Sequence, residues 1–346
     1  MATALRIGVI GLSHDHVWDH LGDLTTSENV VFVGAAEKDE QLRAKLEHEY
    51  SSRTWAHWNE MLEAVELDAV FVYASNREGA EASVVAADRG LHVMIEKPMA
   101  ATFAGAQAML ASASRAGTAL MVNWPFAWWP QMQQALAAVE DGLIGRVWQV
   151  KYRAAHAGPA ELGCSHQFCD WLFDEGESGG GAMMDYCCYG TTLARVIIGK
   201  PEQVIGISGR FCKTELLVED NAIIVMKTRN SMATAEASWT QIGKMTSYTT
   251  SLYGTTGTLL VEPRQGGRLL LSTETDPEGS ALPVVPQDPH MASATEHFVH
   301  HIRTGDELLP LCRADICCDS QEILEAGKES IKSGRQISLP LASQGA

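Results

Sequence analysis

The chain has 346 residues, of which 46% are hydrophobic and 20% are charged, as is typical of a soluble globular protein long enough for two domains. Its net charge of −17 argues against nucleic acid or an anionic membrane as a partner. No apolar run approaches the ~18 residues of a membrane span. The first residues lead directly into a predicted strand without the pattern of a signal peptide, so we expect a cytoplasmic protein.

The eight cysteines include adjacent pairs at 187–188 and 317–318, which make a poor disulfide framework. We therefore expect reduced, buried thiols. Cys164, His166 and Cys169 could be read as zinc ligands, but no second cluster with matching spacing accompanies them. We predict no metal site.

Residues 7–11 predict a first strand, and the turn from Gly11 to His16 follows it. A dinucleotide-binding turn uses three glycines, for the turn itself, for the approach of the pyrophosphate and for helix packing. Only Gly11 matches this pattern. Ser13 is small enough for close approach, whereas His16 is far larger than glycine. By itself this motif is weak.

Residues 29–37 predict a second strand that ends in a carboxylate, Glu37. Glu37 lies 21 positions beyond His16, about where an acid accepts hydrogen bonds from an adenosine ribose. A carboxylate there repels a 2′-phosphate, so NAD is favoured over NADP, although Lys38 would soften this preference. Alternatively, Glu37 is only a charged residue that opens a loop.

Buried strands at 68–74, 91–96 and 118–123 alternate with helical patterns at 78–89 and 102–116. This alternation predicts right-handed crossovers and a doubly wound parallel sheet. We therefore expect an α/β fold with an N-terminal Rossmann domain at residues 1–123.

Lys97 lies where one of these strands leaves the sheet, between Glu96 and Pro98. Proline cannot donate a sheet hydrogen bond and favours an extended residue before it. Ligands of open α/β sheets bind at this carboxyl edge, so Lys97 is a candidate active-site cation. The alternative is a surface lysine beside a solvated glutamate.

After Asn123 the sequence becomes aromatic and proline-rich, which places the domain boundary here, and a helix is predicted at 131–141. The indoles of Trp124, Trp128 and Trp129 form either interdomain core or a platform for a sugar ring. The sequence leaves both readings open.

A half-exposed strand at 147–153 precedes a loop with His156 and His166, then Trp171 and three glycines at 179–181. Helical signal resumes at 182–189. Asp185 and Tyr189 are four residues apart, so both should project from one helix face. They form either a structural hydrogen bond or part of a cleft that faces Lys97.

Later patterns predict an open, mostly antiparallel sheet and two closing helices at 292–304 and 313–332. We therefore expect a C-terminal α+β domain at residues 124–346. His297, His300 and His301 are interpreted as residues of a solvated face or a cleft rim. The predicted strands are residues 203–210, 221–227, 233–239, 247–253 and 258–261.

By these features the chain resembles the glucose–fructose oxidoreductase / inositol dehydrogenase / rhizopine-catabolism (Gfo/Idh/MocA) family over nearly its full length. Residues 90–98 are similar to the family motif G-k-H-V-x-x-E-K-P, and residues 179–189 to G-G-G-x-x-x-D-x-x-x-[HY]. The family's T-P-N-x-x-H becomes Ala-Ser-Asn-Arg-Glu-Gly at 74–79, and Leu172 replaces the arginine of its W-R pair.

The resemblance implies a nicotinamide-dependent oxidoreductase of sugars, polyols or their keto forms that assembles as a homodimer or homotetramer. It implies Lys97, Asp185 and Tyr189 as catalytic residues. The expected cofactor-binding residues are Gly11, Leu12, Ser13, His14, His16, Glu37, Lys38, Ala74, Ser75, Asn76, Glu96, Lys97 and Asn123. The expected substrate-binding residues are Lys97, Trp124, Trp128, His156, Trp171, Asp185 and Tyr189.

Our first hypothesis is hydride transfer from a secondary hydroxyl to NAD, with Lys97 or Tyr189 accepting the hydroxyl proton. A lysine base at neutral pH needs its pKa lowered from about 10.4 by several units. An ionised Asp185 beside Lys97 would oppose that, so we expect Asp185 to orient the substrate or Tyr189. The alternatives are redox-assisted glycoside cleavage and a non-catalytic sugar or cofactor sensor.

Overall fold

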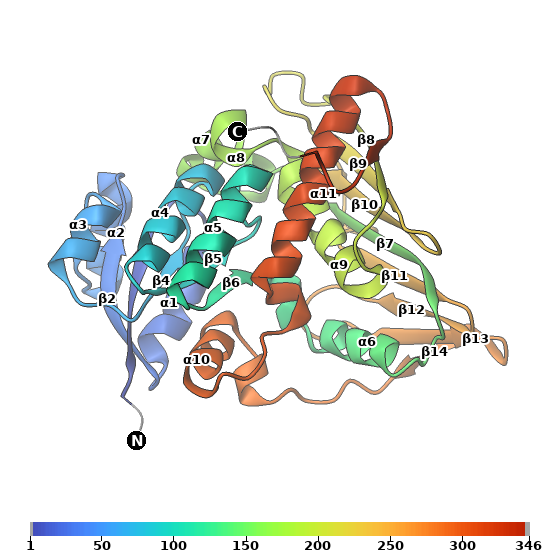
Figure 1. The fold of residues 1–346 in the computed structure, drawn as a ribbon, viewed down its shortest axis with the longest axis horizontal. Coiled ribbons are helices and arrows are strands. Elements are labelled where there is room, and N and C mark those ends of the chain that lie inside the picture. Colours follow the sequence, from blue (N-terminus) through green and yellow to red (C-terminus); the bar gives the residue numbers. More distant parts are fainter. Residues whose placement is uncertain (1–2, 343–346) are drawn as a thin grey trace.

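A computed structural model describes residues 3–342 and shows two sheets at opposite ends of the long axis, with helices packed between and in front of them (Figure 1). The outermost residues of both predicted domains, Met1–Ala2 and 343–346, lie outside the described range. Within that range no helix has the length and apolar character that a membrane span requires.

The first sheet has six parallel strands in the order β3-β2-β1-β4-β5-β6, which confirms the predicted doubly wound fold. Its central strands are buried on both faces, which is why they read as continuous apolar runs. The two-residue β3 was not predicted. The strands are β1 (Leu5–Ile10), β2 (Val30–Ala36), β3 (Thr54–Trp55), β4 (Ala69–Val72), β5 (His92–Glu96) and β6 (Leu120–Asn123).

The helices of this half begin and end at local signals in the sequence. In α5, the Thr102 hydroxyl caps the first turn by accepting the Gly105 N–H, and Gly117 ends the helix in the left-handed conformation. Two helices, α2 and α3, were not predicted. The helices are α1 (His16–Thr26), α2 (Glu40–Tyr50), α3 (Trp58–Ala64), α4 (Asn76–Asp88) and α5 (Phe103–Ala116).

The second sheet has nine strands in the order β14-β13-β12-β11-β7-β10-β9-β8-β15, all antiparallel neighbours except β7 and β10. This confirms the mostly antiparallel open sheet. The strands β13, β14 and β15 were not predicted; β14 is largely exposed and lacks apolar alternation, and β15 has only two residues. The strands are β7 (Val147–Ala155), β8 (Gln203–Gly209), β9 (Asn221–Lys227), β10 (Met232–Ser238), β11 (Thr249–Gly254), β12 (Gly257–Val261), β13 (Leu269–Thr273), β14 (Asp276–Leu282) and β15 (Ile337–Ser338).

Helices cover one face of this sheet, and α11 lies between the two halves of the molecule (Figure 1). The remaining helices are η1 (Pro125–Trp128), α6 (Pro130–Glu140), η2 (Ala160–Leu162), α7 (His166–Leu172), α8 (Glu175–Ser178), the π-helical η3 (Met183–Cys187), α9 (Cys188–Ile198), η4 (Pro289–Met291), α10 (Ala294–Thr304), η5 (Pro310–Cys312) and α11 (Ala314–Ser333).

The closing helix α10 packs against the first sheet. The rings of Phe298 and Phe71 lie 5.9 Å apart, and Ser27 donates a hydrogen bond of 2.7 Å to Glu296. The domain boundary after residue 123 therefore stays a prediction. The interpretation of His297 as a rim residue is wrong: it is 2% exposed, and its Nε2 accepts the Leu309 N–H at 2.9 Å, because it lies on the apolar face of α10.

Candidate active site

Two glycines allow close backbone contacts just before Asp185, and one of them meets the segment that follows Lys97. A Cβ on Gly179 would lie 2.2 Å from the carbonyl oxygen of Ala101, four residues after Lys97. A Cβ on Gly181 would lie 2.2 Å from the Glu219 carbonyl oxygen. Only glycine fits at these contacts, so the Gly-rich stretch brings the start of η3 against the end of β5.

Lys97 and Asp185 form a buried ion pair. The Lys97 Nζ lies 2.5 Å from Asp185 Oδ1 and 3.3 Å from the Asp185 carbonyl oxygen, and the two residues are 3% and 6% exposed. The other carboxylate oxygen of Asp185 accepts the indole N–H of Trp239 at 3.2 Å. Both carboxylate oxygens of Asp185 therefore have hydrogen-bond partners, and the Lys97 ammonium is fixed just beyond the C-terminal end of β5.

This pairing changes the expected role of Asp185. Burial by itself lowers the pKa of Lys97, but the Asp185 carboxylate outweighs burial and raises that pKa above its ordinary value. The ion pair adds a role that the sequence did not predict for Asp185, and the expectation that Asp185 orients the substrate or Tyr189 stays a prediction. Lys97 is a protonated acid here, poised to donate a proton.

Aromatic side chains pack around the ring of Tyr189. Its ring stacks on Tyr152 at 5.7 Å and meets the edges of Trp124 and Phe126 at 5.2 and 5.1 Å, while the Lys97 Nζ lies 5.4 Å from its centre. Burial raises the pKa of Tyr189 well above its ordinary value, so the phenol is protonated at neutral pH. Among residues 3–342 its hydroxyl has no hydrogen-bond partner, which leaves it available to a ligand.

A cleft of about 320 Å³, which we call the central cleft, brings these groups together. Residues from both halves of the chain line it. Of the expected residues, Lys97, Asp185, Tyr189, His156, His14 and His16 line this cleft. Trp129, one of the three indoles considered for a sugar platform, also lines it, and so do Tyr186, Tyr248 and Arg264, which were not anticipated. Tyr186 lies at a variable position of the quoted motif, directly after Asp185, whereas Tyr248 and Arg264 carried no signal in the sequence.

Three expected indoles do not line the central cleft. Trp124 is 1% exposed and its N–H faces the Cys317 sulfur at 3.4 Å, while the Trp128 N–H donates to the Asn123 side chain at 2.8 Å. The tight turn of η1 directs both inward, so they are core, and Trp129 lines the cleft instead. Trp171 packs against Phe168 at 5.1 Å.

His156 is the expected substrate-binding histidine that reaches the cleft. Its Nδ1 accepts the Gly158 N–H at 2.8 Å, so a neutral ring carries its proton on Nε2. Burial lowers the pKa of His156 to about 4, which keeps the ring neutral at physiological pH. His156 is thus arranged as a neutral hydrogen-bond donor.

The turn after β1 has the geometry of a dinucleotide-binding loop. Gly11 has a φ of 85°, and a Cβ there would lie 2.3 Å from the Ala74 nitrogen, so glycine is required. Glu37 accepts the backbone N–H groups of Leu12 at 2.6 Å and Asp39 at 2.9 Å. A second cavity of about 40 Å³ lies here, lined by Gly11, Ser13, Glu37, Lys38, His57, Trp58 and Ala74 among others.

Other expected cofactor residues bind protein groups. The Ser75 hydroxyl donates to Glu177 at 2.6 Å and the Asn76 amide to the Ser178 carbonyl at 2.7 Å, which ties α4 to α8. The Lys38 ammonium pairs with Glu78 at 2.7 Å. Neither Ser75 nor Asn76 lines the small cavity, so their contact with the cofactor stays a prediction.

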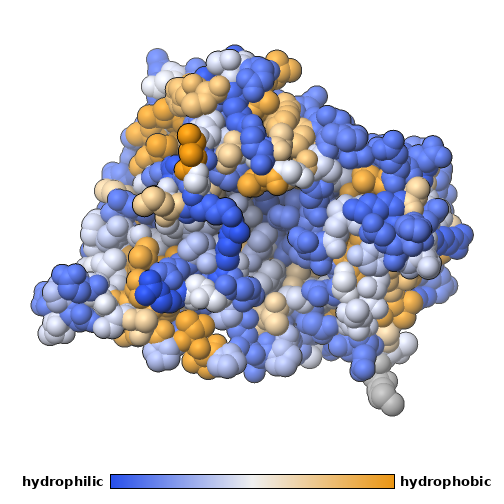
Figure 2. All heavy atoms as spheres, turned by 180° about the vertical axis from the view of Figure 1, so that it is seen from behind, coloured by the Kyte–Doolittle hydropathy of each residue, from blue (hydrophilic) through white to orange (hydrophobic). Residues whose placement is uncertain are grey.

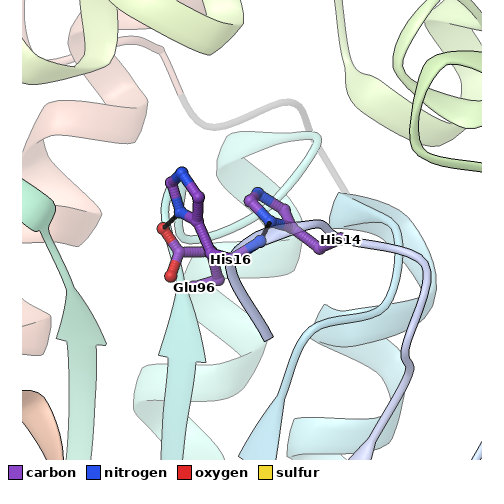
Figure 3. A group of neighbouring side chains, drawn as sticks. All are labelled: His14, His16 and Glu96. Atoms are coloured by element: carbon purple, nitrogen blue, oxygen red, sulfur yellow. Dashed lines mark hydrogen bonds and ion pairs between the residues drawn. The ribbon is translucent and has the colours of Figure 1, made fainter. Parts of the chain in front are cut away.

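Two histidines and a glutamate meet at the same turn (Figure 3). His16 Nδ1 lies 3.1 Å from Glu96, whose other oxygen accepts the Asn123 amide at 2.7 Å, and the His16 N–H donates to His14 Nδ1 at 3.2 Å. Burial by itself raises the pKa of Glu96, but His16 outweighs it and lowers that pKa to about 2. The ring nitrogens of His14 and His16 and a carboxylate oxygen of Glu96 lie within 4.8 Å of one another and could hold a metal ion. The hydrogen bonds just described already occupy most of these atoms.

These features fit an NAD molecule. The loop from Gly11 to His16 lies between the small cavity and the central cleft, so a dinucleotide bound across this loop would reach the central cleft with its nicotinamide. The buried Trp171 indole N–H, beside His14, has no partner among the described residues. An orphaned buried donor at this loop is the kind of group that a cofactor oxygen satisfies.

Comparison with protein-family models decides the family. Residues 5–124 match the model described as an oxidoreductase family with an NAD-binding Rossmann fold, and residues 132–260 match the model for the GFO/IDH/MocA C-terminal domain. The chain belongs to the Gfo/Idh/MocA family. The resemblance drawn from the two motifs is thus confirmed, and the first domain is an NAD-binding Rossmann domain.

Characterised relatives are distant and align over part of their length. D-apiose dehydrogenase of Paraburkholderia graminis is 33% identical over 43% of this chain and 39% of its own. D-xylose 1-dehydrogenase (NADP(+)) 2 of Haloferax volcanii is 27% identical over 58% and 59%. This chain thus aligns with about 40 to 60% of the length of these relatives.

Solved structures share the whole fold of this chain. The crystal structure of an oxidoreductase from Agrobacterium radiobacter in complex with NAD+, L-tartaric acid and magnesium superposes with a TM-score of 0.82. The match covers 97% of this chain and 98% of that protein, at 18% sequence identity. At this identity the likeness establishes the fold alone.

Replacing Glu37 should weaken NAD binding and relax cofactor choice. We expect Glu37→Gln to lower kcat/KM for NAD about 10-fold while raising the NADP-to-NAD ratio, because the negative charge that repels a 2′-phosphate is lost. Initial rates with both cofactors measure this. Glu40→Gln, an exposed carboxylate at the start of α2, is the matched control. An unchanged ratio in Glu37→Gln would contradict the role of Glu37.

Proposed function

We propose that the protein is an NAD-dependent oxidoreductase that transfers hydride between a secondary hydroxyl, or the corresponding ketone, of a sugar or polyol and the nicotinamide. The observation that carries this proposal is the meeting of the Lys97 ammonium and the Tyr189 phenol in one cleft beside the dinucleotide loop. The names of the relatives, which are sugar dehydrogenases, support the same class of substrate.

Each residue of the cleft has a role in this reaction. Bound NAD supplies the hydride acceptor or, when reduced, the donor. Lys97 donates its proton to the ketone oxygen during reduction, and its neutral form, which the raised pKa restricts to alkaline pH, accepts the hydroxyl proton during oxidation. Asp185 positions the ammonium and sets its pKa. Tyr189 and His156 each donate a hydrogen bond that orients the substrate.

A substrate panel tests the proposal. Sugars, polyols and glycosides are incubated with NAD, and both NADH absorbance and released aglycone are measured. A dehydrogenase accumulates NADH in proportion to the oxidised product. Aglycone release with only catalytic NAD would instead indicate redox-assisted glycoside cleavage, and no chemistry on any compound would indicate a sensor.

We further propose that the chain assembles into homodimers or homotetramers through the uncovered face of the nine-stranded sheet. Side chains of β8 and β9 that point away from the helices are apolar and exposed: Ile207 is 65% exposed, Ile205 41% and Val225 39%. Figure 2, which views the molecule from behind, shows several hydrophobic patches over the half that carries this sheet. Such clusters mark protein interfaces.

Introducing negative charges on the uncovered face of the nine-stranded sheet should therefore dissociate the oligomer. We expect the double substitution Ile207→Glu and Val225→Glu to yield monomers, because burying two carboxylates in an apolar interface is unfavourable. Light scattering coupled to size-exclusion chromatography measures the mass. Leu217→Glu, at an 87% exposed site in the β8–β9 loop, is the control. A wild-type monomer would refute the assembly.

A cytoplasmic location is also proposed. All eight cysteines are free thiols, and the adjacent Cys187 and Cys188 are both buried. Buried, unpaired thiols suit a reducing compartment.

A further inference from the structure

Two residues that line the central cleft have a backbone conformation that is rare for residues other than glycine. Among the described residues, three that are not glycine have a positive φ: Ser51, Tyr248 at 58° and Arg264 at 68°. Two of the three line the cleft. Such conformations are unfavourable for bulky side chains and persist where the surrounding structure enforces them, often at ligand sites.

The surroundings hold the backbone of Arg264 in this conformation. Gln131 of α6 is 1% exposed, and its amide donates to the carbonyl oxygens of Glu262 at 2.8 Å and Arg264 at 2.6 Å. The Gly267 N–H also donates to the Arg264 carbonyl at 3.1 Å. A buried glutamine thus anchors an otherwise exposed loop at the position where Arg264 enters the cleft.

The guanidinium of Arg264 has no protein partner in the described part of the chain. It forms no ion pair or side-chain hydrogen bond there, and it lies 5.5 Å from the centre of the Tyr248 ring. The other cation of the cleft, Lys97, is already neutralised by Asp185. Arg264 is therefore the cation in the cleft whose charge remains available to a ligand.

A pair of tyrosines connects the two cations. The hydroxyl groups of Tyr186 and Tyr248 lie 2.8 Å apart. The Lys97 Nζ lies 5.7 Å from the centre of the Tyr186 ring, and Arg264 lies over the Tyr248 ring. The cleft thus has a reactive cation at one end of the tyrosine pair and an unpaired cation at the other.

We propose that the substrate is an anionic sugar, whose carboxylate or phosphate is bound by Arg264 while a secondary hydroxyl lies at Lys97. This proposal rests on the proposed dehydrogenase function. A guanidinium binds the oxygens of a carboxylate or phosphate through two parallel N–H groups. A neutral sugar would offer Arg264 only hydroxyl oxygens, which are weaker acceptors for a guanidinium than a carboxylate or phosphate.

The test compares D-glucuronate, D-glucose 6-phosphate and D-glucose, together with D-gluconate, on wild type and Arg264→Gln. NADH formation gives kcat/KM, and calorimetry on the enzyme with bound NADH gives affinity without turnover. In wild type we expect at least one acidic sugar to exceed D-glucose by about 10- to 100-fold in affinity. Arg264→Gln should remove this preference by lowering the affinity for the acidic sugars to about that for D-glucose.

Further variants and a comparison of ligands distinguish the possible outcomes. Arg264→Lys should retain part of the preference, and Arg229→Gln, which removes an exposed arginine outside the cleft, should retain all of it. The ranking of carboxylate against phosphate identifies the anionic group. Equal affinity for acidic and neutral sugars, or a preference that survives in Arg264→Gln, overturns the proposal while the dehydrogenase function stands. Tight binding of acids without any NADH formation would instead overturn the proposed function alone.

Discussion

Replacing Lys97 with alanine is expected to lower kcat by about 10²- to 10⁴-fold while NAD binding persists. Lys97 is the proposed proton donor and acceptor, and its Nζ lies 5.4 Å from the centre of the Tyr189 ring, whereas Lys97 does not line the small cavity at the Gly11 loop, where we expect the cofactor. Stopped-flow or steady-state rates measure the loss, and quenching of tryptophan fluorescence by NADH measures cofactor binding. Near wild-type turnover would exclude Lys97 from the reaction.

A second variant separates lost chemistry from lost stability. In Lys97→Ala the Asp185 carboxylate stays buried without its cation, which costs about 3 to 5 kcal/mol of folding free energy. The double variant Lys97→Met with Asp185→Asn removes both charges and retains an amide for the Trp239 N–H. We expect it to recover most of the stability in urea unfolding and none of the activity.

Replacing Asp185 with asparagine is expected to move the pH profile of sugar oxidation to lower pH. Asp185 holds the pKa of Lys97 above its ordinary value, against the opposing effect of burial. Without the carboxylate the lowering effect of burial is opposed chiefly by Glu96, so the pKa of Lys97 falls and the neutral amine forms at lower pH. The pH at which kcat/KM for oxidation rises toward its plateau should therefore be lower than in wild type, even where the plateau value itself falls.

In the reductive direction the same fall in the pKa of Lys97 lowers the rate at alkaline pH instead of raising it. Ketone reduction needs the protonated ammonium, so in Asp185→Asn it should decline at a lower pH than in wild type. Trp239→Phe is the control, because it removes the other contact of Asp185 and leaves its charge in place. Coincident profiles for wild type and Asp185→Asn would show that Lys97 is not the titrating group.

The sequence was most informative where a short stretch determines its own structure. The apolar run of β5, stopped by Pro98, located Lys97 at the carboxyl edge of a parallel sheet, and the alternation of strands and helices predicted the doubly wound fold. The short strand β3 and the exposed β14 were missed, because two residues or a largely solvated strand have no apolar periodicity.

Predictions that needed a long-range contact were less successful. The aromatic cluster at 124–129 indicated a boundary, but the turn of η1 decided that Trp129, and neither Trp124 nor Trp128, lines the cleft. Ser75 and Asn76 followed a strand as cofactor residues should, yet α8, which lies 102 residues further along the chain, binds their side chains.

By itself, the sequence determined the two sheets, the dinucleotide loop and the positions of Lys97, Asp185 and Tyr189, since hydrophobic period and glycine geometry act over a few residues. The tertiary structure decided the charge state of Lys97 and the presence of Arg264 in the cleft. The reason is physical: a pKa depends on which charge arrives within a few ångströms, and Asp185 arrives from 88 residues away through the contact that Gly179 permits.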